Sequence, residues 1–161
     1  MSINDDKQIA IKTATNKRVL KEIQRMKGIY DSIDLEYVED NNMIVSLQKK
    51  RNNYKFYIPI NYPFETPMLD INGMNQQTFF KIRSLRLKTA LKQISGLDCL
   101  CCNTHLCKGN WCPSTTMDQI IKQIEDFQRF KYLTIVKILL DKIKEQYFNK
   151  DIELESWLFI Y

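Results

Sequence analysis

The chain has 161 residues, 44% of them hydrophobic, which is the size and composition of one domain with a single core. Its 24 basic and 19 acidic residues leave a formal charge of +5 spread along the chain, and this mild excess is not the signature of a specific nucleic-acid partner. No apolar run approaches the roughly 18 residues that cross a bilayer, and the start is too polar for a signal peptide. We therefore expect a single domain over residues 1–161, intracellular in the cytoplasm or nucleus, with no membrane partner.

The five cysteines are unevenly distributed, because four of them lie between Cys99 and Cys107. A secreted disulfide scaffold has an even number of cysteines that are spread along the chain. The odd, crowded set instead indicates a reducing compartment.

The first predicted element is an amphipathic helix that begins after Thr15 or Asn16, either of which can cap it, and ends before Gly28. Helical spacing predicts an inner apolar face made of Val19, Leu20, Ile23 and Met26. The predicted outer face is mainly basic and holds Lys17, Arg18, Lys21 and Glu22.

Strand-like runs follow over residues 33–38, 43–47 and 54–60, separated by polar turns that contain asparagine. A fourth short strand is predicted over residues 68–71, after a turn over residues 62–67 that prolines stiffen and keep out of the sheet. The pattern predicts a four-stranded antiparallel meander.

The period becomes helical again over residues 75–94, and Gly96 can terminate this helix. Its predicted apolar side is formed by Phe80, Leu87, Leu91 and Ile94. Its basic residues are expected to form a solvated surface. The fold class is therefore α+β, with a helix first, the sheet next and helices after it.

Thr115 or Thr116 can cap a further helical stretch, whose apolar residues are Ile120, Ile121, Ile124 and Phe127. Helical spacing resumes through Leu133, Val136, Leu140, Ile143 and Tyr147. Without an intervening glycine or proline, one long helix and two helices joined near Arg129 both remain open. The apolar residues 157–161 are expected to pack on the body or to meet a partner.

Four separated segments form a recognisable series. They are the basic helix residues 17–23, the strand and turn over residues 54–67, Gly96-Leu97-Asp98-Cys99-Leu100, and Trp111-Cys112-Pro113-Ser114. In this order they resemble the first helix, the Tyr-Pro-Phe-x-x-Pro turn, the active-cysteine segment and the Trp-Ser-Pro loop of ubiquitin-conjugating enzymes. The resemblance covers residues 13–127, leaves residues 128–161 as a C-terminal helical extension, and in its cysteine-dense form is similar to members from large DNA viruses.

The resemblance implies the fold of those enzymes and their thioester chemistry. Cys99 would accept ubiquitin or a ubiquitin-like protein from an activating enzyme and pass it to a lysine. The residues implied to meet a RING-type ligase are Phe64, Pro113 and Ser114. Those implied to meet the activating enzyme and the ligase are Lys17, Arg18 and Lys21.

The chain also departs from the family pattern. It has no His-Pro-Asn motif between Pro67 and Cys99, and a lost oxyanion donor costs about 2.7 to 4 kcal/mol in transition-state stabilisation. Transfer is expected to be slow unless Asn103, Asn110 or a backbone amide replaces the donor. Loss of catalysis would leave a scaffold that binds ubiquitin or a ligase.

The identity of the reactive cysteine remains open. Cys102 is the alternative to Cys99, since a register shifted to it brings Trp111 closer to its usual offset. His105, the single histidine, is expected to be a lone surface histidine with no role; the alternative is a base for an incoming amine.

A zinc site competes for the same side chains. Cys99, Cys102 and Cys107, with either His105 or Cys112, have ligand types suited to tetrahedral zinc. Zinc would occupy the nucleophile and would make the chain an interaction module; otherwise no cofactor is expected. Apart from this alternative, Cys112 is expected to pack beside Trp111.

Overall fold

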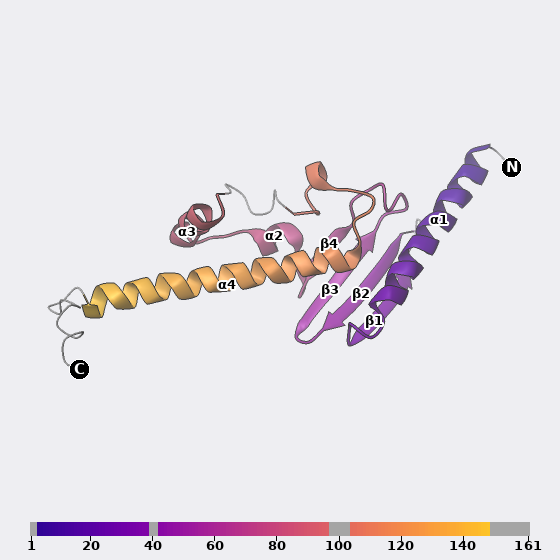
Figure 1. Cartoon of the computed structure of the whole chain (residues 1–161). Helices are drawn as coiled ribbons and strands as arrows, with labels where there is room; N and C mark the ends of the chain where they lie inside the picture. Colours follow the sequence, from indigo (N-terminus) through magenta and orange to yellow (C-terminus); the bar gives the residue numbers. More distant parts are fainter. Residues whose placement is uncertain (1–2, 39–41, 97–103, 149–161) are drawn as a thin grey trace. The chain divides into compact units, whose positions relative to one another are not determined.

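The computed structural model describes residues 3–38, 42–96 and 104–148 (Figure 1). They form an α+β fold with an N-terminal helix, an antiparallel sheet and helices toward the C-terminus, as the sequence predicts in outline. Two compact units can be distinguished: residues 3–81 with 104–124, and residues 82–96 with 125–148. Within the described part of the chain, no helix combines the length and the apolar character that a bilayer crossing needs.

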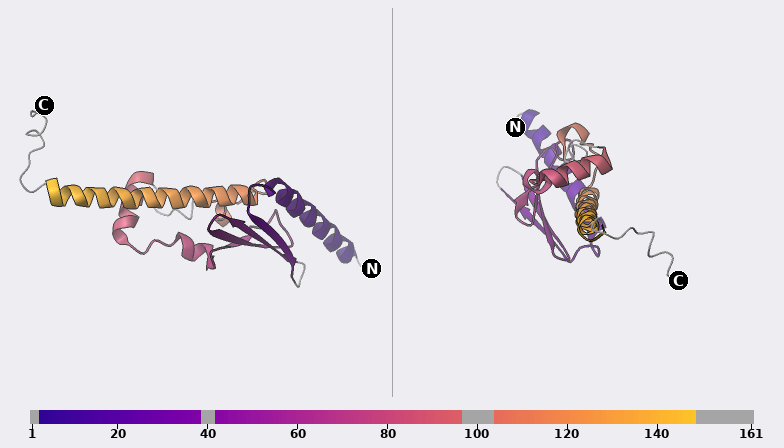
Figure 2. Two further views of the ribbon diagram at one scale, coloured as in Figure 1. Left: turned by 90° about the horizontal axis from the view of Figure 1, so that it is seen from below. Right: turned by 90° about the vertical axis from the view of Figure 1, so that its left-hand side faces the viewer.

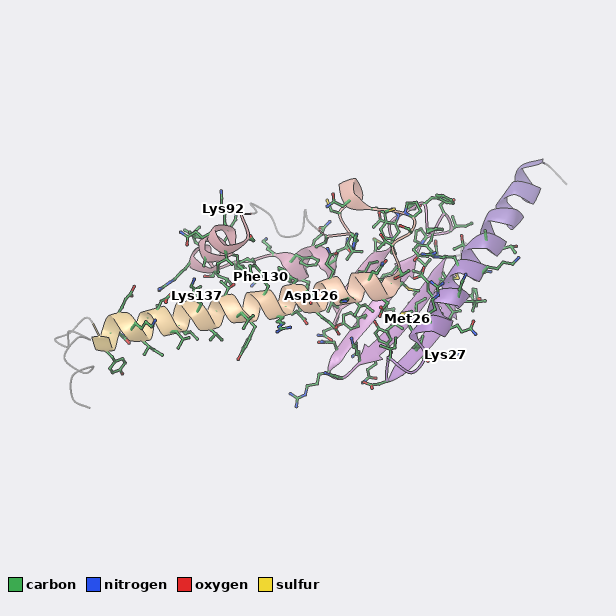
Figure 3. All side chains as sticks on the ribbon, in the orientation of Figure 1. Met26, Lys27, Lys92, Asp126, Phe130 and Lys137 are labelled. Atoms are coloured by element: carbon green, nitrogen blue, oxygen red, sulfur yellow. The ribbon has the colours of Figure 1, made fainter. Side chains whose placement is uncertain are left out.

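Helix α1 (Ile3–Met26) begins well before the predicted start, so that Thr15 lies inside the helix rather than capping it. Val19, Ile23 and Met26, the last labelled in Figure 3, are buried as predicted. The predictions that Leu20 lies on the inner face and Glu22 on the outer face are wrong. Leu20 is 49% exposed and Glu22 is buried, because a spacing of three and four residues puts position 22 on the same face as 19, 23 and 26.

The sheet runs in the order β1 (Ser32–Tyr37), β2 (Met43–Lys49), β3 (Asn52–Ile58), β4 (Met68–Ile71) and β5 (Met74–Asn75), with every neighbouring pair antiparallel. Alternate side chains of the three central strands are buried on one face, as the period of two requires. These core residues are Met43, Val45, Leu47, Tyr54, Phe56, Ile58, Leu69 and Ile71.

The predicted four-stranded sheet is wrong by one short strand. Strand β5 has two residues and pairs with β4 through Asp70 with Asn75 and Ile71 with Met74. The turn between them is Asn72-Gly73, both with positive φ, of 52° and 77°. Asn-Gly is a strong signal for a two-residue hairpin, so the missed strand was readable in the sequence.

The single helix predicted over residues 75–94 is two helices, α2 (Gln76–Phe80) and α3 (Leu85–Ser95). Each has its own N-cap: the side-chain oxygen of Asn75 accepts from the Thr78 amide at 2.9 Å, and that of Ser84 accepts from the Leu87 amide at 3.3 Å. Gly96 ends α3 in the left-handed conformation, as predicted, with φ of 71°.

After the short 3-10 helix η3 (Lys108–Asn110), helix α4 (Met117–Phe148) runs unbroken for 32 residues, which decides between the two predicted possibilities. Thr116 caps it in a reciprocal arrangement. Its hydroxyl accepts from the Gln119 amide at 3.3 Å, and the Gln119 side chain accepts from the Thr116 amide at 2.9 Å. The predicted core residues of this segment, Ile120, Ile121, Ile124 and Phe127, are buried.

In the second unit, α3 lies across α4, as Figures 1 and 2 show from different directions. Leu87 and Leu91 are the buried residues of α3. Thr134 is buried on α4. Ile94, predicted to join the apolar side of its helix, is 46% exposed.

Candidate functional site

A buried carboxylate joins three segments of the first unit. Glu22 is only 2% exposed, and its Oε1 accepts hydrogen bonds from Arg18 Nε at 2.6 Å and from the Tyr62 hydroxyl at 2.7 Å. Its Oε2 accepts from the backbone amide of Met117 at 2.8 Å. Buried charges need such partners, and here the partners tie α1 to the first turn of α4 and to the turn that contains Tyr62.

The electrostatics of this network follow from its packing. Burial, with the charge and hydrogen bond of Glu22, raises the pKa of the Tyr62 hydroxyl far above its ordinary value. Partial burial opposes the charged form of Arg18, but the charge and hydrogen bond of Glu22 outweigh this and raise the pKa of the guanidinium. Tyr62 is therefore a neutral hydrogen-bond donor and Arg18 a permanent cation.

Two loops that carry the sequence resemblance are held by α1. We call residues 61–67 the Tyr-Pro turn and residues 111–116 the Trp loop. Thr15 Oγ1 lies 2.7 Å from the Ile60 carbonyl oxygen and 2.8 Å from that of Tyr62, so that its one hydroxyl hydrogen is shared between the two acceptors. Arg18 Nη2 donates to the carbonyls of Ser114 and Thr115 at 3.4 and 3.3 Å. One helix therefore positions both loops.

The two loops also contact one another directly. The indole nitrogen of Trp111 donates to the Pro63 carbonyl at 2.8 Å, and its ring lies 6.1 Å from that of Tyr62, centroid to centroid, in a tilted arrangement. The peptide bond between Tyr62 and Pro63 is cis. Tyr62 and Pro67 are buried and Pro63 is half-buried, so these three residues form the framework of the turn.

The residues expected to meet a ligase are exposed on these joined loops. Phe64 is 80% exposed, and Pro113 and Ser114 are also exposed. We call Phe64, Pro113 and Ser114 the two-loop platform. An aromatic ring left in water on a turn with a buried framework is available for binding rather than for packing.

On α1, Lys17 and Lys21 are exposed, whereas Arg18 is half-buried. Arg18 is thus engaged inside the molecule, with Glu22 and the Trp loop, and only the two lysines are fully presented to a partner.

Cys112 does not pack beside Trp111 as predicted, because its side chain is exposed. Its sulfur lies 3.0 Å from the hydroxyl oxygen of Ser114. Hydrogen bonds from the side chain and backbone of Ser114 lower the pKa of this thiol below its ordinary value. The Trp loop therefore carries an accessible thiol with increased thiolate character.

The predicted nucleophile Cys99, its alternative Cys102, and Asn103 lie outside the described residues. Of the other predicted zinc ligands, His105 and Cys107 are half-buried, and the backbone amide of His105 donates to the Gln123 side chain at 2.9 Å. Among the described side chains, no three of the types His, Cys, Asp and Glu gather into a metal-binding group.

A cavity of about 380 Å³ lies next to residues 104–107, which follow Asn103 in the chain. Its lining includes Pro67, Met68, Gln76, Phe80, Leu106 and Cys107. Gln76 Oε1 is buried there, and no hydrogen-bond partner for it is found among the described residues.

The asparagines that follow β4 have structural roles. Asn72 Oδ1 accepts from the Asn53 amide at 2.8 Å, while Asn75 caps α2. Asn110, the predicted substitute for an oxyanion donor, directs its side-chain nitrogen at the Thr104 carbonyl at 3.5 Å. The side-chain oxygens of Asn72 and Asn75 are thus acceptors in a turn and a helix cap, and the side-chain nitrogen of Asn110 contacts a loop carbonyl.

Comparisons with protein-family models, with curated proteins and with solved structures give no match to this chain.

The residues that hold the site together were not predicted from the sequence. Glu22 was assigned to the outer face, although its spacing from Val19, Ile23 and Met26 pointed inward. Thr15 was assigned to a cap, and nothing in the local sequence reveals its bonds to carbonyls 45 and 47 positions away.

Proposed function

We propose that this protein is a thioester carrier of the ubiquitin-conjugating type, which accepts ubiquitin or a ubiquitin-like protein on Cys99 and transfers it to lysine. The observation that carries the proposal is the bond from Trp111 to the Pro63 carbonyl, 2.8 Å long. It joins the two loops on which the resemblance rests, and it leaves the platform residues exposed.

The order of elements supports the finer fold assignment. Helix α1 comes first, followed by the antiparallel meander with the Tyr-Pro turn between β3 and β4. After α2 and α3 come the cysteine segment, the Trp loop and α4, so the segments that carry the resemblance keep the order that it implies. The buried network of Glu22 brings the first helix, the turn and the last helix to one place. On this basis we propose a ubiquitin-conjugating-enzyme-like fold for residues 13–127.

The proposed reaction has two acyl transfers. The thiolate of Cys99 attacks the thioester carbonyl carbon at the modifier's C-terminus, and the thiolate of the activating enzyme leaves. A lysine amine then attacks the new thioester, so that an amide bond forms, the bond to sulfur breaks and the amine gives up its proton. His105, which is half-buried, is the candidate acceptor for that proton.

The platform and α1 supply the proposed partner contacts. Phe64 would insert into an apolar site on a RING-type ligase, with Pro113 and Ser114 beside it. Lys17 and Lys21 would provide charge for the activating enzyme and the ligase. Arg18 would act mainly by holding the Trp loop in position, through its bonds to the carbonyls of Ser114 and Thr115.

A catalytically inactive scaffold of the same fold is the second candidate, and one observation favours it. The side-chain nitrogens of Asn72 and Asn110 donate within the protein, to Asn52 Oδ1 at 3.1 Å and to the Thr104 carbonyl at 3.5 Å, whereas a catalytic carrier would need a donor near the reacting carbonyl. In this reading the two-loop platform still binds a ligase, but no thioester forms.

The test is a charging assay with activating enzyme, ATP and ubiquitin, read on a non-reducing gel. We expect an adduct that reductant removes and that Cys99→Ser abolishes as a thioester, whereas the matched variants Cys102→Ser and Cys112→Ser still charge. If no adduct forms with any of several ubiquitin-like modifiers, the proposed carrier function is refuted. If only Cys102→Ser loses the adduct, the nucleophile is Cys102 rather than Cys99. Native mass spectrometry should also be used to test the purified protein for bound zinc, because one retained zinc per chain would favour the zinc-bound interaction module.

A further inference from the structure

The cavity of the first unit is lined by residues from the start of β4, from α2 and from the loop before η3. Its volume of about 380 Å³ falls within the range of about 300 to 1,000 Å³ that ligand pockets have. The lining is mainly apolar, with Pro67, Met68, Phe80 and Leu106 as its walls. Among the described residues that line it, none is lysine, arginine, aspartate, glutamate or histidine. The cavity is therefore suited to an uncharged, largely apolar occupant.

One polar atom in this lining stands out. Gln76 Oε1 is buried, and among the described side chains and backbone groups no hydrogen bond to it is found. A buried acceptor without a donor is destabilising, and native proteins contain few of them. An acceptor of this kind in the wall of a cavity is suited to a donor on a bound molecule.

The walls of the cavity are held by hydrogen bonds of their own. Asn75 caps α2 by accepting from the Thr78 amide at 2.9 Å, which fixes the helix turn that begins with Gln76. In the facing loop, the Thr104 carbonyl accepts from the Cys107 amide at 3.1 Å. A ligand that enters a preformed cavity has little chain to order, so more of its contact free energy remains as affinity.

We propose that this cavity binds an uncharged, mainly apolar small molecule that donates one N–H or O–H hydrogen bond to Gln76 Oε1. The apolar walls disfavour a charged ligand, which would lose its hydration without gaining a counter-charge. The acceptor favours a ligand with a donor over a purely apolar one of the same shape. An aromatic ring that carries a single N–H, as in indole, combines both properties. The proposal does not rest on the thioester chemistry.

Water is the alternative occupant of the cavity. At about 30 Å³ for each molecule, several waters have room in this volume. A buried water is typically held by about three hydrogen bonds, however, and the side chains of Pro67, Phe80 and Leu106 offer none. A molecule that presents apolar surface to these walls releases such poorly held water, which favours its binding.

Titration of the whole chain with indole and with benzothiophene tests the proposal. The two probes have nearly the same shape, but only indole carries an N–H donor. Carbon-13 methyl labelling of the methionines allows binding to be followed by NMR, and Met68→Leu assigns the Met68 signal. This signal should shift with either probe, because Met68 lines the cavity. The Met26 signal should not shift, since Met26 is buried beneath α1 and does not line the cavity.

Substitution of Gln76 tests the proposed hydrogen bond. Gln76→Met removes the acceptor and keeps a side chain of similar length. We expect the ratio of the benzothiophene Kd to the indole Kd to fall about 3- to 10-fold in this variant, the effect of losing one net hydrogen bond. Gln77→Met makes the same change at the next position of α2, where the side chain is exposed, and should keep the native ratio.

Each result decides the proposal. If neither probe shifts the Met68 signal up to its solubility limit, the cavity is not a binding site and the proposal is overturned. If both probes bind but the Kd ratio is the same in the native chain and in Gln76→Met, the proposed donor bond is wrong. A native Met26 signal shows that the first unit of a variant is folded. Gln76→Leu is a second variant without the acceptor and should give the same fall in the ratio.

Discussion

The indole N–H of Trp111 donates to the carbonyl oxygen of Pro63 across 48 positions of sequence, at 2.8 Å. This bond joins the Trp loop directly to the Tyr-Pro turn, in addition to the bonds by which α1 holds each loop. The geometry of the two-loop platform depends on it, because Phe64 follows Pro63 directly, and Pro113 and Ser114 follow Trp111 within three residues.

Replacing Trp111 with Phe should loosen this junction. The tilted ring contact with Tyr62 is retained in part, but the Pro63 carbonyl loses its donor, at a cost of about 1 kcal/mol in the free energy of unfolding. Urea denaturation measures the loss. Phe64→Ala is the control, because this exposed ring should contribute less than about 0.5 kcal/mol to stability. A Trp111→Phe protein as stable as the native chain would contradict the assigned role.

Glu22→Gln should destabilise the first unit more than any exposed carboxylate does. The amide keeps the shape of the side chain but turns one acceptor into a donor, which then faces either Arg18 Nε or the Met117 amide. Bonds to charged groups contribute about 1.5 to 3 kcal/mol, and we expect a loss in that range. Glu36→Gln on exposed β1 should change the unfolding free energy by less than about 0.5 kcal/mol under the same conditions. Equal effects of the two substitutions would show that the buried network adds nothing.

Tyr62 should make stability fall in alkaline solution. Its folded-state pKa is raised, first by burial and then by Glu22, so the folded protein favours the neutral phenol. Below about pH 10 the hydroxyl is neutral in both states, and its contribution is fully present. Above that, only the unfolded chain ionises this group, and the native protein should lose up to about 1.4 kcal/mol per pH unit relative to Tyr62→Phe.

Unfolding measured from pH 8 to 11 for the native chain and for Tyr62→Phe gives this difference directly. The fall in stability should persist in the Glu22→Gln background, because burial, the larger cause of the raised pKa, remains. A difference between native and Tyr62→Phe that stays constant over the whole range would be inconsistent with a raised pKa.

Local pattern was enough to predict most elements of the fold. The prolines around residues 62–67 placed β4 at Met68–Ile71 without error, and Thr116 was correctly named as a possible cap of the last helix. The break between α2 and α3 was not predicted, because apolar spacing continues across it. Asn75 and Ser84 are residue types that favour an N-cap, and each caps one of the two helices. Their capping role becomes evident only from the hydrogen bond that each side chain accepts from a backbone amide.

The site was predicted only where its residues face solvent. Phe64, Pro113 and Ser114 were named from the sequence, and their exposure agrees with a binding role. The support beneath them was not found, since Glu22 meets Tyr62 and Met117 at separations of 40 and 95 residues. Amphipathic spacing assigns charges outward by default, and only the tertiary fold supplies the donors that allow one to be buried.

At neutral pH, alkylating reagents should modify Cys112 faster in the native protein than in the Ser114→Ala variant. The hydrogen bonds of Ser114 lower the thiol pKa, so the native protein has the larger thiolate fraction, and the midpoint of its rate against pH should rise when the hydroxyl is removed. Iodoacetamide labelling followed by tryptic digestion measures this at one site, because the peptide of residues 109–122 contains Cys112 and no other cysteine. Ser114→Thr is the matched variant: it retains a hydroxyl and should keep the faster rate. Equal rates for Ser114→Ala and Ser114→Thr would mean that the backbone alone sets the reactivity of this thiol.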